Sequence, residues 1–161
     1  MASWNDITAA SPDLAKKVEA AFGAHKHKVM ATLRKDGAPR LSGTEVELFD
    51  GDLWLGSMPD ARKAQDLQRD PRVAVHSAPI DVDLQTTPDC KVAGRAVEIT
   101  DDGEKSAWVN RYQEEGKEMP PGPFHLFRLD LDEVVCTWVD GDKMHVESWH
   151  AGRGTTHVER T

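Results

Sequence analysis

Hydrophobic and polar residues alternate along much of the chain, and this two-residue period predicts β-strands. Early in the chain, for example, Val29, Ala31 and Leu33 fall on one face of an extended segment. Turn sequences at 35–37 and 50–51 would join the first three strands into an antiparallel meander. About seven strands are expected in total, from eight candidate segments at 28–34, 40–49, 53–55, 72–77, 90–99, 124–131, 134–139 and 144–149.

Helices are predicted where capping residues precede a helical hydrophobic period. Ser-Pro-Asp at 11–13 gives a serine cap, a proline in the first turn and an acid, and Leu14, Val18 and Phe22 follow at a spacing of four, up to Gly23. Three helices are therefore expected, at 11–23, between Pro59 and Asp70, and from Asp101 to about residue 114, where Trp108 and Tyr112 share one side.

The order of these elements favours a mainly β, α+β architecture. Consecutive strands with short turns indicate an antiparallel sheet, and a closed or split β-barrel with about three helices outside it is the most economical arrangement. The 161 residues suit a single domain that spans the whole chain. Residues 78–88 are polar and irregular and predict a loop, and the Gly-, Thr- and charge-rich residues 150–161 predict a flexible tail.

Charge and cysteine content exclude several functions. A net charge of −8 argues against general binding of nucleic acid or an anionic membrane surface. No apolar run reaches membrane-spanning length, and the first residues contain no signal-peptide pattern. Cys90 and Cys136 are far apart and form no CxxC motif, so free, inert thiols and a cytoplasmic location are expected. No metal site is predicted, because no His or Cys cluster has ligand spacing.

The central segment 53–72 carries the clearest candidate chemistry. Ser57 ends a short strand, and Arg62 and Lys63 lie at the start of the following helix. Free N–H groups and the positive end of the helix dipole favour an anion there, so a phosphate site is one interpretation. The alternative is a plain capping box at 57–60, with both cations paired to Asp66.

The second predicted strand carries polar residues on one face. Arg40, Ser42 and Thr44 share this face, which continues as Val46 and Leu48. A polar end on an otherwise hydrophobic face indicates a ligand groove at the rim of the sheet. An exposed strand end is the alternative interpretation.

These residues together carry a resemblance to a known family. Ala-Arg-Lys-Ala at 61–64, followed by Leu67 and Asp-Pro-Arg at 70–72, resembles the flavin-phosphate segment of the pyridoxamine 5′-phosphate oxidase-like family of flavin- and deazaflavin-binding split β-barrels. Ser57 and Arg40 match the hydroxyl and the arginine that precede this segment in the family. The resemblance implies a homodimer that binds FMN or the deazaflavin F-420 at the subunit interface. It implies cofactor contacts from Arg40, Leu41, Ser42, Gly43, Gly56, Ser57, Arg62 and Lys63.

Two departures from the family pattern narrow the expected activity. The strand that begins at Arg40 reaches Glu45, where the family has a base, and the C-terminus lacks the motif that grips pyridoxal phosphate. The resemblance therefore implies a flavin- or deazaflavin-dependent oxidoreductase acting on a small conjugated substrate, not a true pyridoxamine phosphate oxidase. No catalytic side chain is assigned. The alternative is a non-catalytic flavin or haem binder, which the seven histidines, including His25 and His27, leave open.

Overall fold

Six antiparallel strands close into a barrel, and two further strands extend it. The computed structural model describes residues 1–78, 87–119 and 121–161. The sheet order is β3-β2-β1-β4-β5-β6-β7-β8, and an additional pairing of β3 with β6 closes the barrel. The strands are β1 (His27–Leu33), β2 (Pro39–Phe49), β3 (Asp52–Ser57), β4 (Arg72–His76), β5 (Asp89–Glu98), β6 (His125–Asp140), β7 (Lys143–His150) and β8 (Gly154–Arg160).

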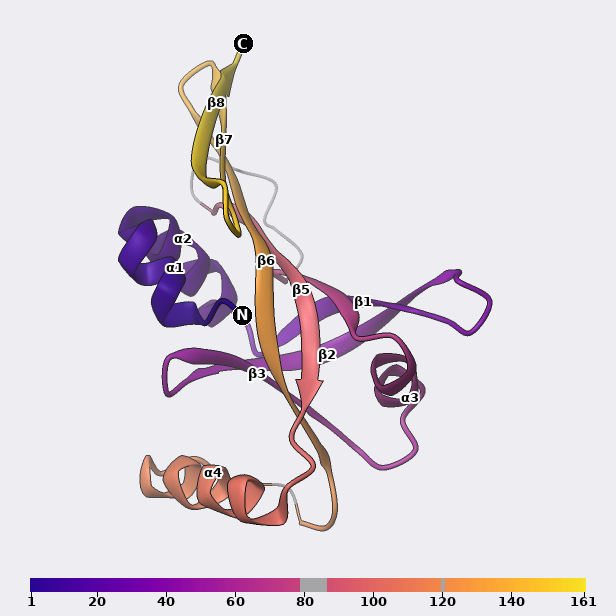
Figure 1. Ribbon diagram of the computed structural model, residues 1–161. Coiled ribbons are helices and arrows are strands. Elements are labelled where there is room, and N and C mark those ends of the chain that lie inside the picture. The colour runs from indigo at the N-terminus through magenta and orange to yellow at the C-terminus, as the bar shows by residue number, and fades with distance from the viewer. Residues whose placement is uncertain (79–86, 120) are drawn as a thin grey trace.

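Four helices in the described part of the chain pack outside the barrel (Figure 1). α1 (Trp4–Ala10) and α2 (Pro12–Gly23) lie together on one side, α3 (Arg62–Arg69) lies on the opposite side, and α4 (Asp102–Glu114) lies below. The predicted α+β barrel with outer helices is confirmed. α1 was not predicted from the sequence. Its start is fixed by a capping box between Ser3 and Asp6, and it buries Trp4 and Ile7.

Two groups of hydrophobic side chains form the interior. The larger group fills the barrel around Phe127 and continues under α1 and α2. The smaller group lies between the barrel and α4, where Trp108 stacks on Tyr112 at 4.7 Å and both contact Phe49. Trp54 also packs into this group and donates its indole N–H to the Phe49 carbonyl oxygen. The aromatic face predicted for α4 is therefore what holds this helix on the sheet.

The two strands predicted at 124–131 and 134–139 are one strand, β6. Its pairing with β5 shifts register between Ala93 and Gly94, so that Asp132 is an extra residue in the ladder. This bulge interrupts the alternation in the sequence, which is why the segment resembled two strands. A Cβ on Gly94 would lie 2.0 Å from the carbonyl oxygen of Asp130, so glycine is required for the close approach of the two backbones.

Residues 154–160, which the sequence predicted as part of a flexible tail, form β8 on the outer edge of β7. Gly152 and Gly154 take positive φ angles and make the turn that reverses the chain. β8 is exposed along its length and has no hydrophobic face, so the sequence pattern did not reveal it. Side chains attach it instead: Thr155 hydrogen-bonds Ser11, whose hydroxyl therefore does not cap α2 as predicted.

Other sequence predictions have mixed outcomes. Cys90 and Cys136 are buried free thiols whose sulfur atoms lie 2.8 Å apart, directly across β5 and β6. Their mutual hydrogen bond and burial raise the pKa of Cys90, in line with inert thiols. None of the helices in the described part of the chain has the length and hydrophobicity to cross a bilayer. Most of the loop predicted at 78–88 lies outside the described residues.

Candidate functional site

The segment between β3 and α3 does not form the capping box that its sequence allows. α3 begins at Arg62, and its N-cap residue Ala61 makes no side-chain capping bond. Asp60 has a positive φ of 60°, so the chain turns sharply before the helix. Ser57, four residues before the N-cap, is buried, and its hydroxyl has no hydrogen-bond partner among the described residues. A buried hydroxyl without a partner costs free energy, which makes it a candidate contact for a ligand.

Lys63 connects α3 to β2. Its ammonium group donates a hydrogen bond of 2.8 Å to the carbonyl oxygen of Gly43. Burial lowers the pKa of Lys63, and the negative charge of Glu45 acts in the opposite direction. Arg62 is exposed and reaches Gln65 at 3.4 Å. Asp66 pairs with Arg40 and Arg69 and not with Arg62 or Lys63, so the pairing within α3 that the sequence allowed is not formed.

Asp66 is buried and holds Arg40 against α3. The Nε of Arg40 lies 2.6 Å from one carboxylate oxygen of Asp66, and Arg69 donates to the other at 3.0 Å. Thr32, which faces Arg40 across β1 and β2, donates to the same carboxylate. Burial alone would raise the pKa of Asp66, but the hydrogen bonds from Arg40, Arg69 and Thr32 lower it. The sequence identified Arg40 but not its pairing with Asp66, because the spacing of Asp66 from Arg62 and Lys63 suggested ion pairs within the helix.

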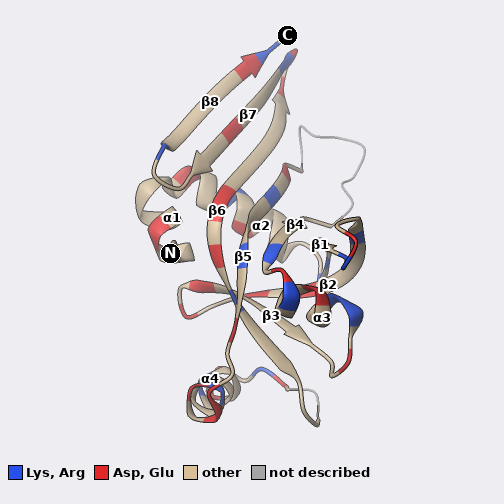
Figure 2. Ribbon diagram, turned by 45° about the vertical axis from the view of Figure 1, so that its right-hand side comes forward, with Lys and Arg blue, Asp and Glu red and all other residues tan. Residues whose placement is uncertain are grey.

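β2 and β3 separate before α3 and leave their facing backbone unpaired. They pair only as far as Val46 and Leu55, while the other edge of β3 pairs with β6 from Trp54 to Ser57. A Cβ built on Gly43 or on Gly56 would meet no described atom within 4 Å. A flat ligand could therefore approach the main chain at both glycines. Figure 2 shows basic residues of α3 and of neighbouring strands on this same side of the barrel.

The eight predicted contact residues are thus partly brought together. Gly43 and Lys63 touch through the hydrogen bond described above, and Arg40 reaches α3 through Asp66. Leu41 points outward with 73% of its surface exposed, while Ser42 is half-buried on the opposite face. The strand face predicted to carry Arg40, Ser42, Thr44, Val46 and Leu48 points inward only as far as Val46. Beyond it Phe49 is buried and Leu48 is exposed.

A histidine that sequence reasoning missed lies opposite Ser57. His125 and Ser57 are paired residues of β6 and β3. The imidazole Nδ1 of His125 lies 2.6 Å from a carboxylate oxygen of Glu98, and Gln68 of α3 donates to the same carboxylate. The pairing of His125 with Ser57 arises only when β3 closes the barrel against β6, so no local spacing in the sequence reveals it.

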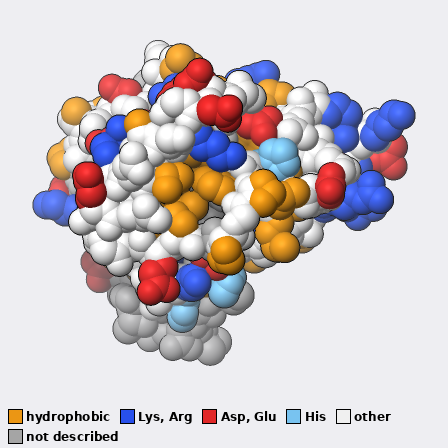
Figure 3. Space-filling view, turned by 90° about the horizontal axis from the view of Figure 1, so that it is seen from below, with side chains coloured by type: hydrophobic (Ala, Val, Ile, Leu, Met, Phe, Trp, Pro, Cys, Tyr) orange, Lys and Arg blue, Asp and Glu red, His pale blue; other side chains and the backbone are white. Residues whose placement is uncertain are grey.

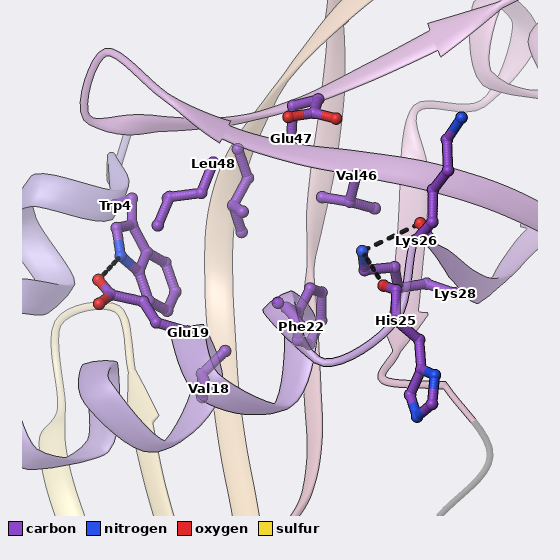
Figure 4. Close-up of a pocket in the computed structure, with 12 residues that line it drawn as sticks. Trp4, Val18, Glu19, Phe22, His25, Lys26, Lys28, Val46, Glu47 and Leu48 are labelled. Atoms are coloured by element: carbon purple, nitrogen blue, oxygen red, sulfur yellow. Dashed lines mark hydrogen bonds between the residues drawn. The ribbon is translucent and has the colours of Figure 1, made fainter.

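One pocket lies elsewhere, between α2 and the strands β2 and β3 (Figure 4). Its volume is about 370 Å³, and Phe22, Val18 and Leu48 give it a hydrophobic wall. Lys28 is buried at its edge, donates to the carbonyl oxygens of His25 and Lys26, and has its pKa lowered by burial. None of the predicted cofactor contacts lines this pocket.

Comparison with known proteins places the chain among flavin-related barrels. The family model described as pyridoxamine 5′-phosphate oxidase matches residues 14–137. None of the curated proteins matches the chain. Among solved structures, the chain spans only 58% of the length of a protein of unknown function from Agrobacterium tumefaciens, with a TM-score of 0.60 and 22% identity over 81% of this chain. It spans 98% of the length of a protein from Nostoc punctiforme.

Three of these structures show the range of proteins that share the fold. PhzG from Burkholderia lata, in complex with tetrahydrophenazine-1-carboxylic acid, has a TM-score of 0.62 and 15% identity over 96% of this chain and 91% of its own. The Nostoc punctiforme protein, related to the oxidases and FMN-binding, has a TM-score of 0.59 and 16% identity over 100% of this chain. A haem-binding protein from Mycobacterium smegmatis has a TM-score of 0.59 and 13% identity over 92% of this chain and 88% of its own.

Proposed function

Because the chain belongs to the pyridoxamine 5′-phosphate oxidase family, we propose that it binds a flavin or a deazaflavin and moves a hydride between this ring and a small conjugated substrate. The observation that carries the proposal is the buried, unpartnered hydroxyl of Ser57 just before α3, with two cations on the first turn of that helix. A bound phosphate would supply the missing hydrogen bond and neutralise the cations.

Three residues would hold the phosphate. Ser57 would donate its hydroxyl proton, and Arg62 and Lys63 would add charge-assisted hydrogen bonds. Lys63 would share its ammonium group between the phosphate and the Gly43 carbonyl that it already contacts. Arg40 is fixed by Asp66, and its guanidinium charge would contribute to the positive potential at this end of α3.

The backbone beside the phosphate site would accept the ring. Gly43 and Gly56 leave open space over the main chain, and Leu41 and Ser42 would flank it. When bound, the flavin or deazaflavin supplies the hydride chemistry, and the protein supplies binding and orientation. No side chain needs to act as a nucleophile in this scheme. The residues of β2 and β3 would position the ring and exclude water from one of its faces.

A homodimer would complete the site. Leu41 and Met58 are 73% and 77% exposed, which is high for large hydrophobic side chains, and both lie in segments next to α3. A second copy of the chain that covered Leu41 and Met58 would also enclose a ring bound beside them. Figure 3 shows hydrophobic side chains gathered on the lower face of the molecule.

Haem binding is the second candidate, because the fold is similar to that of the haem-binding protein from Mycobacterium smegmatis. The two candidates differ in their spectra. Haem added to the protein would give a strong Soret band, whereas a flavin would give a band that bleaches on reduction. The unpartnered hydroxyl of Ser57 and the two cations on the first turn of α3 favour the flavin, because a flavin phosphate would pair with them.

Titration of the purified protein with FMN and, separately, with the deazaflavin coenzyme tests the proposal through ring fluorescence. We expect micromolar binding of one cofactor and at least a tenfold loss of affinity in Lys63→Ala, which corresponds to about 1.4 kcal/mol. Lys16→Ala is the matched control, because Lys16 is an exposed lysine on α2, away from the site. Binding of neither cofactor, or equal losses in both variants, would reject the proposal.

A further inference from the structure

The β7–β8 hairpin carries a cluster of side chains that the proposed cofactor site does not use. Figure 1 shows this hairpin rising away from the barrel, and it lies beyond residue 137, where the family match ends. His145 of β7 and His157 and Glu159 of β8 each direct one ligand atom to a common point, and these three atoms lie within 4.8 Å of one another. The Nδ1 of His145 is 3.0 Å from the Nε2 of His157 and 3.8 Å from a Glu159 oxygen.

The strand register brings these residues together. His145 and Glu159 are directly paired across β7 and β8, and His157, two residues before Glu159, projects from the same face. Trp138 of β6 is the residue opposite His145, and its ring stacks on His145 at 5.0 Å and on His157 at 5.5 Å. Stacking on the indole fixes the planes of both imidazoles, so the ligand atoms are oriented in advance.

The chemistry of this set is that of a transition-metal site. Two imidazole nitrogens bound at about 2.0–2.1 Å to one tetrahedral zinc ion would lie about 3.3 Å apart, close to the 3.0 Å that separates the nitrogens of His145 and His157. A carboxylate completes the two-histidine, one-carboxylate combination found in protein zinc sites, with a position left for water. Because Glu159 is half exposed, its side chain has room to move closer to the two imidazoles.

Two carboxylates at the cluster are each paired with a lysine. Glu147, on the same face, is bound by Lys17, whose ammonium group lies 3.6 Å from the centre of the Trp138 ring. Lys143 lies 2.9 Å from Glu159, and this hydrogen bond lowers the pKa of Glu159, so the carboxylate is ionised at neutral pH. Lys143 therefore competes with a metal ion for the carboxylate.

We propose that His145, His157 and Glu159 bind one divalent transition-metal ion, with zinc as the reference ion, and so clamp β8 to β7. The alternative state of the same cluster is a simple hydrogen bond between two neutral imidazoles. The two states are distinguishable, because a metal site needs the third ligand and the hydrogen bond does not. The site is independent of the proposed cofactor site, on which it does not rest.

Calorimetric titration of the untagged, chelator-treated protein with ZnCl₂ tests the proposal. We expect one ion per chain, and an affinity that falls at least tenfold in His157→Gln and also in Glu159→Gln. His27→Gln is the matched control. It removes an exposed histidine that also neighbours a carboxylate, Glu45 at 3.5 Å, but that lies in β1 and outside the cluster of His145, His157 and Glu159. No heat of binding at millimolar zinc, or the same affinity in His157→Gln and His27→Gln, would overturn the proposal.

Two further readouts identify the ligands directly. In Lys143→Gln the competitor for Glu159 is gone, so zinc should bind more tightly than in wild type. Cu²⁺ added to the protein should give an electron paramagnetic resonance spectrum with coupling to two nitrogens, reduced to one in His157→Gln. A spectrum that does not change in this variant would show that the ion binds elsewhere and would overturn the assignment.

Discussion

Among single residues, Ser57 is the side chain whose substitution should change cofactor affinity without lowering the stability of the fold. Its hydroxyl is buried without a partner among the described residues, so it contributes nothing favourable to the folded chain alone. We predict that Ser57→Ala leaves the free energy of unfolding unchanged or raises it by up to about 1 kcal/mol, while FMN affinity falls about tenfold. Urea unfolding and FMN titration check both effects.

The control for this prediction is Ser106→Ala, which removes an exposed hydroxyl from α4 and should change neither quantity. If Ser57→Ala instead lost more than about 1 kcal/mol of stability with unchanged FMN affinity, the hydroxyl would be a structural group of the barrel. The proposed phosphate contact at this residue would then be wrong.

Asp66 should give the chain a defined sensitivity to acid. Hydrogen bonds from Arg40, Arg69 and Thr32 lower its pKa below the unfolded value of 3.8. The stabilisation is therefore complete above about pH 4 and is lost as the pH falls through the lower, folded pKa. We predict that Asp66→Asn is less stable than wild type at pH 7, and that the gap between the two narrows below pH 4. Denaturation midpoints measured at several pH values test this, and a constant gap would contradict it.

At the scale of elements, the sequence predicted what local pattern determines and missed what distant pairing determines. The helix boundary at Gly23 and the aromatic face of α4 follow from spacing and capping, and both are observed. β8 has neither a hydrophobic face nor a buried residue, so only its ladder with β7 defines it. The bulge at Asp132 likewise broke the alternation of β6, and only the ladder with β5 shows that β6 is one strand.

The candidate site shows the same division. Ser57, Arg62 and Lys63 were predicted as contact residues from their positions around the start of a helix. In the structure Lys63 reaches Gly43, another predicted contact. The partner of Arg40 and the His125–Glu98 pair were missed, because they depend on α3 packing and on β5 pairing with β6. Neither arrangement has a signal in local spacing.

Gly94 of β5 should not tolerate a side chain. Because an added Cβ would lie 2.0 Å from the backbone oxygen of Asp130, we predict that Gly94→Ala costs several kcal/mol or prevents folding, on the order of the overpacking penalties in protein cores. Gly23→Ala is the control: its Cβ would meet no described atom within 4 Å, and it should be neutral or slightly stabilising. Thermal unfolding of both variants tests this, and equal melting temperatures would show that the two strands can separate locally at no cost.

At the scale of the whole molecule, the exposed hydrophobic side chains around α3 predict self-association. We expect Leu41→Glu, which places a charge on the proposed dimer face, to shift the chain from dimer to monomer in sedimentation velocity experiments. Val158→Glu, a similar change at a half-exposed residue of β8, should leave the dimer intact. Dissociation by the second variant and not the first would place the interface on the C-terminal hairpin instead.

The central claim is that the start of α3 binds the phosphate of a flavin cofactor. The most direct test compares FMN with riboflavin, which has the same ring and no phosphate, by fluorescence titration of wild type and of Ser57→Ala combined with Lys63→Ala. The account predicts that wild type binds FMN at least about tenfold more tightly than riboflavin, and that the double variant binds both alike. Equal affinities in wild type, or a preference for FMN that survives in the double variant, would contradict it.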